Sequence, residues 1–234
     1  MTEVSANQTF NVSTQSEFEA ALVAQATINL VADIYTTSTI YIDGINGLKI
    51  NGNGFKIDGQ SSGFRMFYVT NCNRMELKDL TIANGLLTGS SQAAPAMYIS
   101  NSNIDFERCL ITGHATTGFS ADAGAFIIYS GSVVRMTLCI FEDNRSNDFA
   151  GAVYMASSST LYLIACKFLR HSTVFYGGAI YIASGNKVYS YGTQFEDNSG
   201  RDGADVYRKN GGTFSASSCP SGYYGSEDGS LSCE

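Results

Sequence analysis

Four Gly-Ala dipeptides recur along this chain at a nearly constant spacing. They are separated by 27, 27 and 25 residues and lie at Gly124-Ala125, Gly151-Ala152, Gly178-Ala179 and Gly203-Ala204. A sequence period of this length is typical of proteins built from stacked coils, in which each repeat packs only on its neighbours. The period therefore constrains the architecture strongly, and it says much less about chemistry.

A second column repeats in the same register. At spacings of 30, 27 and 27 residues it contains Cys109, Cys139, Cys166 and Thr193. The tetrapeptide Phe-Glu-Asp-Asn at 141–144 also returns at 195–198, two repeats later. Because several positions repeat together, we expect one continuous register from about residue 65 to 210.

Short runs within each repeat alternate apolar and polar residues, as in Met-Glu-Leu-Lys at 75–78. Alternation with a period of two is typical of β-strands. Asn and Gly clusters such as 51–54 mark turns, because both residue types tolerate left-handed backbone. Two or three strands per coil predict an all-β chain, a parallel β-helix of about seven coils.

The expected organisation has three parts: an N-terminal segment with a capping helix over 1–25, the β-helix over 26–212, and a cysteine-containing tail over 213–234. Ser16 and Glu19 have the spacing of a capping box, with Ser16 as the N-cap. We expect this helix to cover the end of the solenoid, where core and strand edges would otherwise be exposed.

The aligned cysteines at 109, 139 and 166 are expected to point inward on neighbouring coils. That separation is within reach of a disulfide, but an odd stack on parallel strands favours reduced, buried thiols. No Cys-x-x-Cys pair or histidine cluster accompanies them, so we expect no metal and no cofactor. In the tail, Cys219 and Cys233 flank a Gly/Ser/Tyr-rich segment that a disulfide between them would order.

Composition limits the classes of binding partner and the cellular location that we expect for this chain. The 234 residues carry a formal net charge of −7, which argues against nucleic acid as a partner. We expect no membrane-spanning segment and see no signal peptide in this sequence. Glycosylation sequons begin at Asn7, Asn11 and Asn144. Together with the tail cysteines they favour an extracellular or cell-surface location, as part of a longer precursor.

One charged column is the candidate for chemistry. Asp143, Arg170 and Asp197 occupy the same repeat position, so they should stack on adjacent coils, where paired carboxylates with an arginine could cleave a uronate polymer by acid–base catalysis. The alternative is an exposed ladder that neutralises its own charge and contributes little. Arg145, His171 and Arg201 lie nearby and are the candidates for binding.

Two further groups leave alternatives open. The column of His114, Asn144, His171 and Asn198 could bind a metal, but its two histidines are two coils apart, and an asparagine ladder that hydrogen-bonds the turns explains it better. Tyrosines such as Tyr162, Tyr189 and Tyr191 could be sugar-stacking platforms or ordinary cross-coil packing.

These motifs resemble known families. Gly-Gly-Ala-Ile at 177–180 and Phe-x-x-Asn at 141–144 and 195–198 look like the repeats of polymorphic outer membrane proteins. Most of residues 26–212 resembles the right-handed parallel β-helix, or pectin-lyase-like, superfamily. The tail is similar to the start of an EGF-like or ephrin-receptor-like cysteine-rich module. The resemblance implies an adhesive or structural role at a cell surface, with a polysaccharide or glycoprotein as partner.

The same superfamily contains pectate lyases, polygalacturonases and alginate epimerases, so fold alone does not choose the function. The Gly-His-Gly motif of polygalacturonases is broken here, because Gly113-His114 is followed by Ala115, and the Asp-Pro-His-Asp motif of epimerases is absent. A non-catalytic adhesive module is therefore favoured. A polysaccharide lyase, hydrolase or epimerase stays the alternative.

Overall fold

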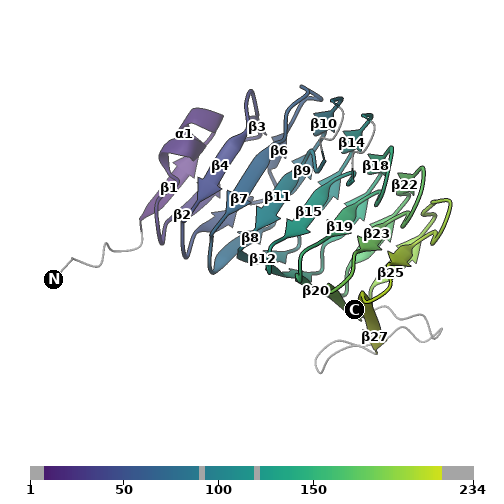
Figure 1. Ribbon diagram of the computed structural model, residues 1–234. Coiled ribbons are helices and arrows are strands. Elements are labelled where there is room, and N and C mark those ends of the chain that lie inside the picture. The colour runs from purple at the N-terminus through teal and green to yellow at the C-terminus, as the bar shows by residue number, and fades with distance from the viewer. Residues whose placement is uncertain (1–7, 90–92, 119–121, 218–234) are drawn as a thin grey trace.

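Residues 8–89, 93–118 and 122–217 are described by a computed structural model of the chain. They form a parallel β-solenoid whose coils follow one another along a single axis (Figure 1). Four sheets run along this axis, with nine, seven, seven and four strands, and every strand pair is parallel. The predicted all-β parallel β-helix of about seven coils is confirmed.

Two of the sheets form consecutive sides of each coil. Sheet A contains β1 (Thr9–Val12), β2 (Thr27–Leu30), β5 (Lys49–Asn51), β8 (Met75–Lys78), β12 (Asn103–Glu107), β16 (Val133–Thr137), β20 (Thr160–Ile164), β24 (Lys187–Tyr191) and β27 (Thr213–Ser217). Sheet B contains β3 (Ile34–Tyr35), β6 (Lys56–Asp58), β9 (Thr81–Ala83), β13 (Leu110–Thr112), β17 (Ile140–Glu142), β21 (Lys167–Leu169) and β25 (Gln194–Glu196).

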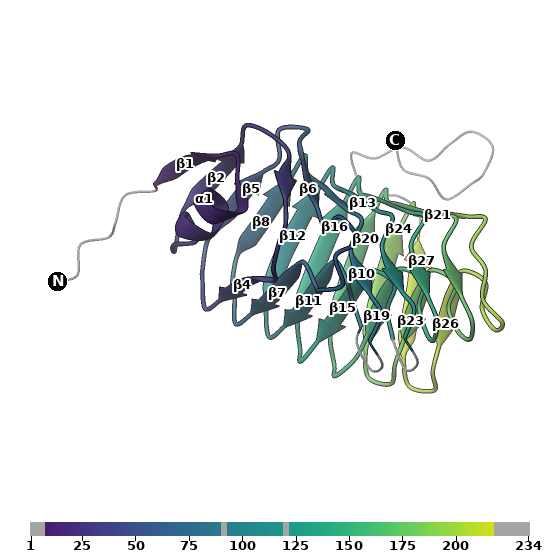
Figure 2. The ribbon, with the colours of Figure 1, turned by 90° about the horizontal axis from the view of Figure 1, so that it is seen from above.

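The other two sheets complete the coil. The short sheet D contains β10 (Leu86–Leu87), β14 (Ala115–Thr116), β18 (Arg145–Ser146) and β22 (Ser172–Thr173). Sheet C contains β4 (Ile40–Asp43), β7 (Phe67–Thr70), β11 (Met97–Ser100), β15 (Phe126–Tyr129), β19 (Val153–Met155), β23 (Ile180–Ile182) and β26 (Val206–Arg208). The chain passes from sheet A to B to D to C in the middle coils, and Figure 2 shows the strands of successive coils side by side.

The core fills the inside of the coils. On most strands every second residue is buried, as in β12, where Ile104 and Phe106 point inward. Aromatic side chains stack along the axis, and the rings of Phe141 and Phe168 lie 4.9 Å apart at 9°. Alternation along each strand thus separates one continuous apolar core from four outward faces.

The repeated glycines have a steric role. A Cβ atom on Gly124 would lie 1.9 Å from the carbonyl oxygen of Gly151, and one on Gly151 would lie 2.1 Å from that of Gly178. The missing side chains therefore let the backbones of consecutive coils approach closely. The fourth dipeptide is shifted by one residue, because Ala204, not Gly203, provides the oxygen that Gly178 faces, at 1.8 Å.

Sharp corners between strands have left-handed backbone. The Asn and Gly clusters predicted that these residue types would mark the turns, but other residue types also adopt this conformation at the corners. At the corner between sheets A and B, Arg108, Leu138 and Ala165 have φ of 51°, 55° and 52°. Asp143, Arg170 and Asp197 take the same conformation at the corner after sheet B, with φ of 54° to 55°. The repeat imposes this conformation on side chains that ordinarily avoid it.

The N-terminal helix α1 spans Gln15–Ala20 and lies at the N-terminal end of the solenoid (Figure 1). Its N-cap is Thr14, not Ser16, and Thr14 and Glu17 form the capping box. The Glu17 carboxylate accepts from the Thr14 backbone N–H at 3.2 Å, which satisfies a donor that the first turn leaves free. Phe18 is fully buried and meets Phe67 edge to face.

Sheet A reaches both ends of the described chain, since β1 pairs with β2 and β27 pairs with β24. The cysteine column is also present. Cys109, Cys139 and Cys166 are free and buried, as is Cys72, so the predicted burial of the column is confirmed. Their S–H groups lie near backbone carbonyl oxygens, as at 3.3 Å between Cys166 Sγ and the oxygen of Met136.

Candidate functional site

The predicted catalytic column is a surface ion pair. Arg170 donates through Nε and Nη2 to the two carboxylate oxygens of Asp143, each at 2.8 Å, and this bidentate contact holds the pKa of Asp143 below its usual range. Both side chains are about half exposed. Asp197 stands at the same corner one coil further on, is exposed, and forms no ion pair with Arg170. The column therefore neutralises its charge in part.

The histidine and asparagine column is a hydrogen-bonded ladder inside the turn after sheet B. The His114 backbone N–H donates to Asn144 Oδ1 at 2.9 Å, the Asn144 N–H donates to His171 Nδ1 at 3.2 Å, and the His171 N–H donates to Asn198 Oδ1 at 2.9 Å. Each ring or amide thus accepts the backbone proton of the preceding coil. The predicted asparagine ladder is confirmed, and histidines take the same place in it.

Burial removes two residues of this column from the candidate list. The His171 side chain is fully buried, so it cannot contact a polymer on the surface, and burial lowers its pKa to about 3. Asn144 is 1% exposed, and its Nδ2, the atom a glycan would occupy, donates to the oxygen of Ile111. Glycosylation at Asn144 is therefore incompatible with the folded coil. The Asn11 side chain is exposed; Asn7, Cys219 and Cys233 lie outside the described residues.

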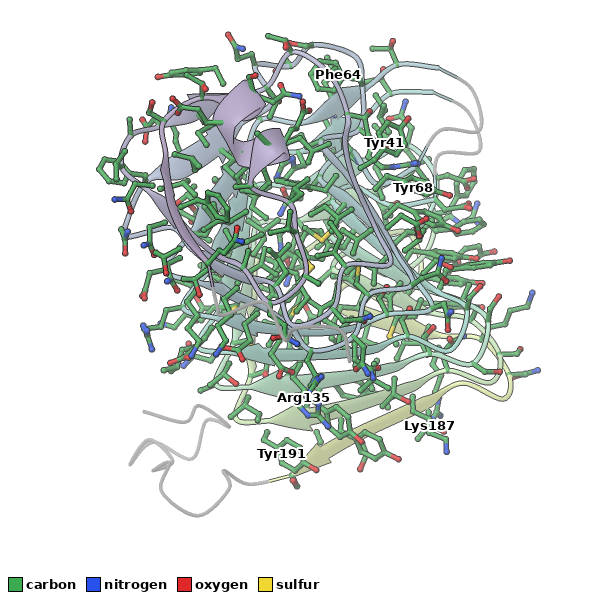
Figure 3. The ribbon with its side chains drawn as sticks, turned by 90° about the vertical axis from the view of Figure 1, so that its left-hand side faces the viewer. Tyr41, Phe64, Tyr68, Arg135, Lys187 and Tyr191 are labelled. Atoms are coloured by element: carbon green, nitrogen blue, oxygen red, sulfur yellow. The ribbon has the colours of Figure 1, made fainter. Side chains whose placement is uncertain are left out.

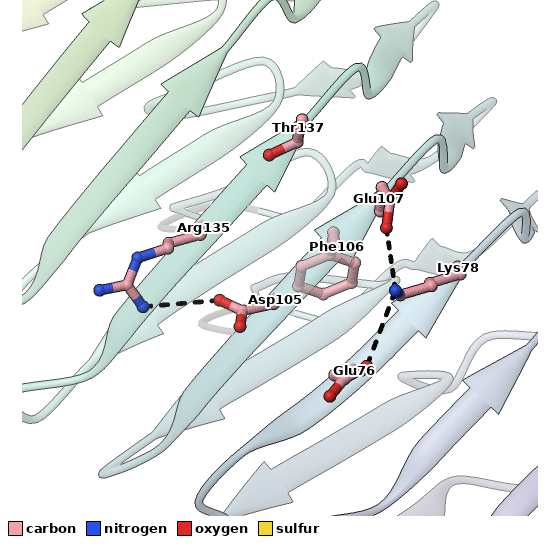
Figure 4. Close-up of a pocket in the computed structure, with 7 residues that line it drawn as sticks. All are labelled: Glu76, Lys78, Asp105, Phe106, Glu107, Arg135 and Thr137. Carbon is pink, nitrogen blue, oxygen red and sulfur yellow. Dashed lines mark ion pairs between the residues drawn. The ribbon is translucent and has the colours of Figure 1, made fainter. Parts of the chain in front are cut away.

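The outward face of sheet A carries charged side chains of both signs around a hollow of about 480 Å³. Lys78 pairs with Glu107 at 3.0 Å and with Glu76 at 3.8 Å, and Arg135 pairs with Asp105 at 3.6 Å (Figure 4). Each cation there already has a carboxylate partner. A charged ligand would have to displace these contacts to bind, so this hollow is a weak candidate.

The outward face of sheet C carries a row of tyrosines. The row runs through one position of the seven strands, in the order Tyr41, Tyr68, Tyr98, Ile127, Tyr154, Tyr181 and Tyr207. Only Ile127 interrupts it. We call these six rings the tyrosine row. Sequence reasoning did not single it out, although the matching segments at 68–73 and 98–103 and the tyrosine spacings of 27 and 26 residues would have revealed it.

Stacking determines what the tyrosine row presents. The rings of Tyr68 and Tyr98 lie 4.7 Å apart at 5°, and those of Tyr154 and Tyr181 lie 5.0 Å apart at 2°. Their faces are thus covered by neighbouring rings, and exposure differs along the row, from 67% at Tyr41 to 6% at Tyr181. Tyr162 and Tyr189 on sheet A stack similarly, at 5.2 Å. The stacked tyrosines are therefore cross-coil packing, and they are exposed to different degrees.

A second aromatic cluster adjoins the C-terminal end of the row. Phe149 lies 5.0 Å from Tyr181, and Tyr176 lies 4.6 Å from Tyr207. Arg201 packs over Phe175 and Tyr176, at 4.8 and 5.2 Å from the ring centres, and donates to the Tyr176 hydroxyl at 3.0 Å. The structure thus brings the predicted binding residue Arg201 to this aromatic face.

Other charged residues differ in their surroundings. Burial raises the pKa of Asp122 and of Asp148, and the charge of Asp148 raises that of Asp122 further. Burial, and then the charge of Asp122, raise the pKa of Tyr154 to about 12. These two carboxylates therefore lie beside the middle of the tyrosine row. Arg145, in contrast, is exposed on β18 in sheet D.

Two general findings concern the described ranges. Within them, no group of three or more His, Cys, Asp or Glu side chains is arranged to hold a metal ion. No helix in the same ranges is long and apolar enough to cross a membrane.

Comparison with known proteins adds one functional description. Residues 9–111 match a family model described as a pectate lyase-like adhesive domain. A solved structure named L. reuteri 53608 SRRP aligns over 90% of this chain and all of its own, at 12% identity and a TM-score of 0.34, values too low to support an argument. No curated protein sequence matches the chain. The family model matches the N-terminal coils of the solenoid and describes an adhesive domain.

Proposed function

We propose that the chain is a non-catalytic module of a cell-surface adhesin that binds a polysaccharide, or the glycan of a glycoprotein, along the tyrosine row. The observation that carries this proposal is the row itself, because it repeats one hydrogen-bonding phenol at nearly every coil of sheet C. The adhesive-domain match supports the general role. The self-neutralised Asp143–Arg170 pair supports the absence of catalysis.

The spacing of the row suits a polymer. Strands in neighbouring coils are roughly 4.8 Å apart, close to the advance per residue of an extended hexose chain. Such a chain would lie along the solenoid axis with about one sugar per coil. Phenol hydroxyl groups both donate and accept, so they match the hydroxyl and ether oxygens of sugars. The contribution of each contact is small and the repeat adds them, as expected for an adhesin.

A glycan array combined with a polyuronate cleavage assay tests the proposal. The wild-type chain should bind at least one extended polysaccharide and release no product. Replacing Tyr68 and Tyr98 by phenylalanine should weaken that binding about tenfold or more, because two hydroxyl groups are lost while stacking is kept. The matched control replaces Tyr162 and Tyr189 on sheet A by phenylalanine and should leave binding unchanged.

Three outcomes would contradict the proposal. Turnover of a polysaccharide would show that the module is an enzyme. Equal loss of binding in the sheet A control would move the site away from sheet C. Binding to none of the polysaccharides on the array would remove the glycan from the proposal. Melting curves of each variant establish that the solenoid remains folded.

A further inference from the structure

Arg65 differs from the charged residues around it. It precedes β7, and its side chain packs over two members of the tyrosine row, with the guanidinium carbon 5.6 Å from the ring centre of Tyr68 and 5.2 Å from that of Tyr98. Nη2 donates to the oxygen of Ala93 at 2.6 Å and Nε donates to that of Ala94 at 3.1 Å. Neutral groups therefore hold this cation in place.

No carboxylate pairs with Arg65 in the described part of the chain, whereas Arg108, Arg135, Arg170 and Arg201 each pair with at least one. The other arginines without an ion pair there, Arg74, Arg145 and Arg208, are exposed, unlike Arg65. A guanidinium has five N–H groups, and the two backbone contacts use two of them. Burial lowers the pKa of Arg65, which reflects the cost of placing a cation here without a counter-charge. Arg65 is thus partly buried, fixed in orientation and left with unused donors.

A purely structural role explains only part of this arrangement. Arg65 does hold the loop at Ala93 and Ala94 of the next coil against its own coil. A neutral donor could make the same two contacts to carbonyl oxygens without the cost of a buried charge. The charge itself becomes useful only when an anion approaches. The chain's net charge of −7 disfavours anions in general, so an anion would bind only beside a cation that lacks a counter-charge.

We propose that Arg65, with Tyr68 and Tyr98, forms a subsite for an anionic group on the bound glycan, either the carboxylate of a uronic acid or a sulfate ester. This inference rests on the proposed function, because it places one charged sugar on the same tyrosine row. The planar guanidinium matches both groups through paired N–H contacts, and the tyrosine rings hold it rigid. The neighbouring phenols contact the sugar hydroxyl groups.

The test compares three probes with one backbone. They are a 1,4-linked galacturonate hexamer, the same oligomer after carboxyl reduction, and the reduced oligomer after sulfation. Calorimetry should show that the wild-type chain binds at least one anionic form about tenfold or more tightly than the neutral form. Arg65→Gln should abolish that preference and leave the affinity for the neutral oligomer within about twofold. Arg145→Gln, on sheet D, is the matched control and should keep the preference.

The outcomes separate the two proposals. Equal affinity of the wild type for neutral and anionic oligomers, or a preference that survives Arg65→Gln, overturns the anionic subsite and leaves glycan binding intact. Absence of any binding overturns the proposed function with it. Preference for the galacturonate or for the sulfated oligomer identifies the source of the anion. If Arg65→Gln lowers the melting temperature, Arg65→Lys, which keeps the charge and loses the planar fork, should show an intermediate preference in a folded chain.

Discussion

The outward faces of sheets A and C share the same parallel register but carry different side chains. On sheet A the outward positions carry both signs of charge, and Lys78 pairs with Glu76 and with Glu107. On sheet C the stacked positions repeat one residue type, tyrosine. Figure 3, viewed along the solenoid from its N-terminal end, shows Tyr41 and Tyr68 on one side and Arg135 and Lys187 on another.

The difference shows how a solenoid controls its surface. A parallel register places equivalent residues of successive coils side by side, so alternating charges cancel and identical side chains form a line. The charged face has already found its partners within the chain. On the aromatic face the rings stack on one another along the row. Repetition, rather than any single side chain, is the reason that we propose sheet C as the binding face.

The largest effect should come from the glycine that sets the register of the aromatic face. Gly151→Ala introduces a Cβ atom at 2.1 Å from a backbone oxygen, which cannot move without displacing the next coil. We expect a loss of more than about 4 kcal/mol in unfolding free energy, measured by urea denaturation. Gly131→Ala is the control, because nothing lies within 4 Å of its Cβ and its φ is +69°. It should cost only about 1–2 kcal/mol, and equal losses would contradict the role of close coil contact.

The second largest effect should be a loss of folding stability at low pH, caused by protonation of the buried histidines. Burial lowers the pKa of His114 to about 4 and that of His171 to about 3, below about 6.5 in an unfolded chain. The unfolded state therefore binds more protons below pH 6.5, so stability is full above that pH and falls as pH drops toward 4. The slope is at most about 1.4 kcal/mol per pH unit for each histidine.

His171→Asn isolates this effect, because asparagine occupies the same ladder position in the neighbouring coils. The variant should lose less stability than the wild type between pH 6.5 and 4.5, as measured by thermal melting. Subtracting the two curves removes the contribution of carboxylates common to both. The paired surface carboxylates of Asp79, Glu107 and Asp143 have lowered pKa values and stay ionised over most of this range. Parallel curves for variant and wild type would show that His171 is not the origin.

A smaller effect concerns the phenols. Tyr154 should ionise at about pH 12, because it is partly buried and faces the charge of Asp122. Asp122→Asn should lower that pKa by about one unit or less, since burial is the larger cause and remains. NMR titration of ring-labelled tyrosine measures the change. An unchanged Tyr154 pKa in this variant would mean that the carboxylate does not face the tyrosine row.

The smallest effect should come from the charged face. Arg135→Ala removes the contact to Asp105 at 3.6 Å between half-exposed side chains, so the expected loss is less than about 1 kcal/mol. Binding of any glycan should not change. Salt titration of the melting temperature supports the measurement, because screening weakens this contact in the wild type only. A loss of several kcal/mol, or of ligand binding, would reverse the ranking of the two faces.

Much of the fold was predictable because equivalent residues of successive coils recur at a regular spacing in the sequence. The column through Asn144 and His171 followed from spacing, and so did the ladder that it forms. The predicted N-cap of the helix, Ser16, is two residues away from the observed one, Thr14. Thr14 and Glu17 have the same capping-box spacing as Ser16 and Glu19. The shift at Ala204 was hidden because an adjacent Gly-Ala pair imitates the repeat.

The binding face was harder to predict than the coils. Strands of sheet C are three or four residues long, and which of their residues point outward depends on loops whose lengths vary between coils. Ile127 also breaks the tyrosine row in the middle. The contact of Arg65 with Tyr98 joins residues 33 positions apart, a distance longer than one repeat, so no periodic comparison reveals it. The sequence showed that charged residues occupy the corners, but it did not show which of them form ion pairs.

The glycine column also determines how the module can grow. At Gly124, Gly151 and Gly178 the absent Cβ leaves space that the next coil's carbonyl enters, whereas the following residue in this column, Ala204, carries a methyl group. A duplicated coil should therefore be accepted after Gly151 and rejected after Ala204, which expression and melting of the two insertions would check. Glycine in this column thus permits the next coil to stack closely, and we expect alanine there to prevent it.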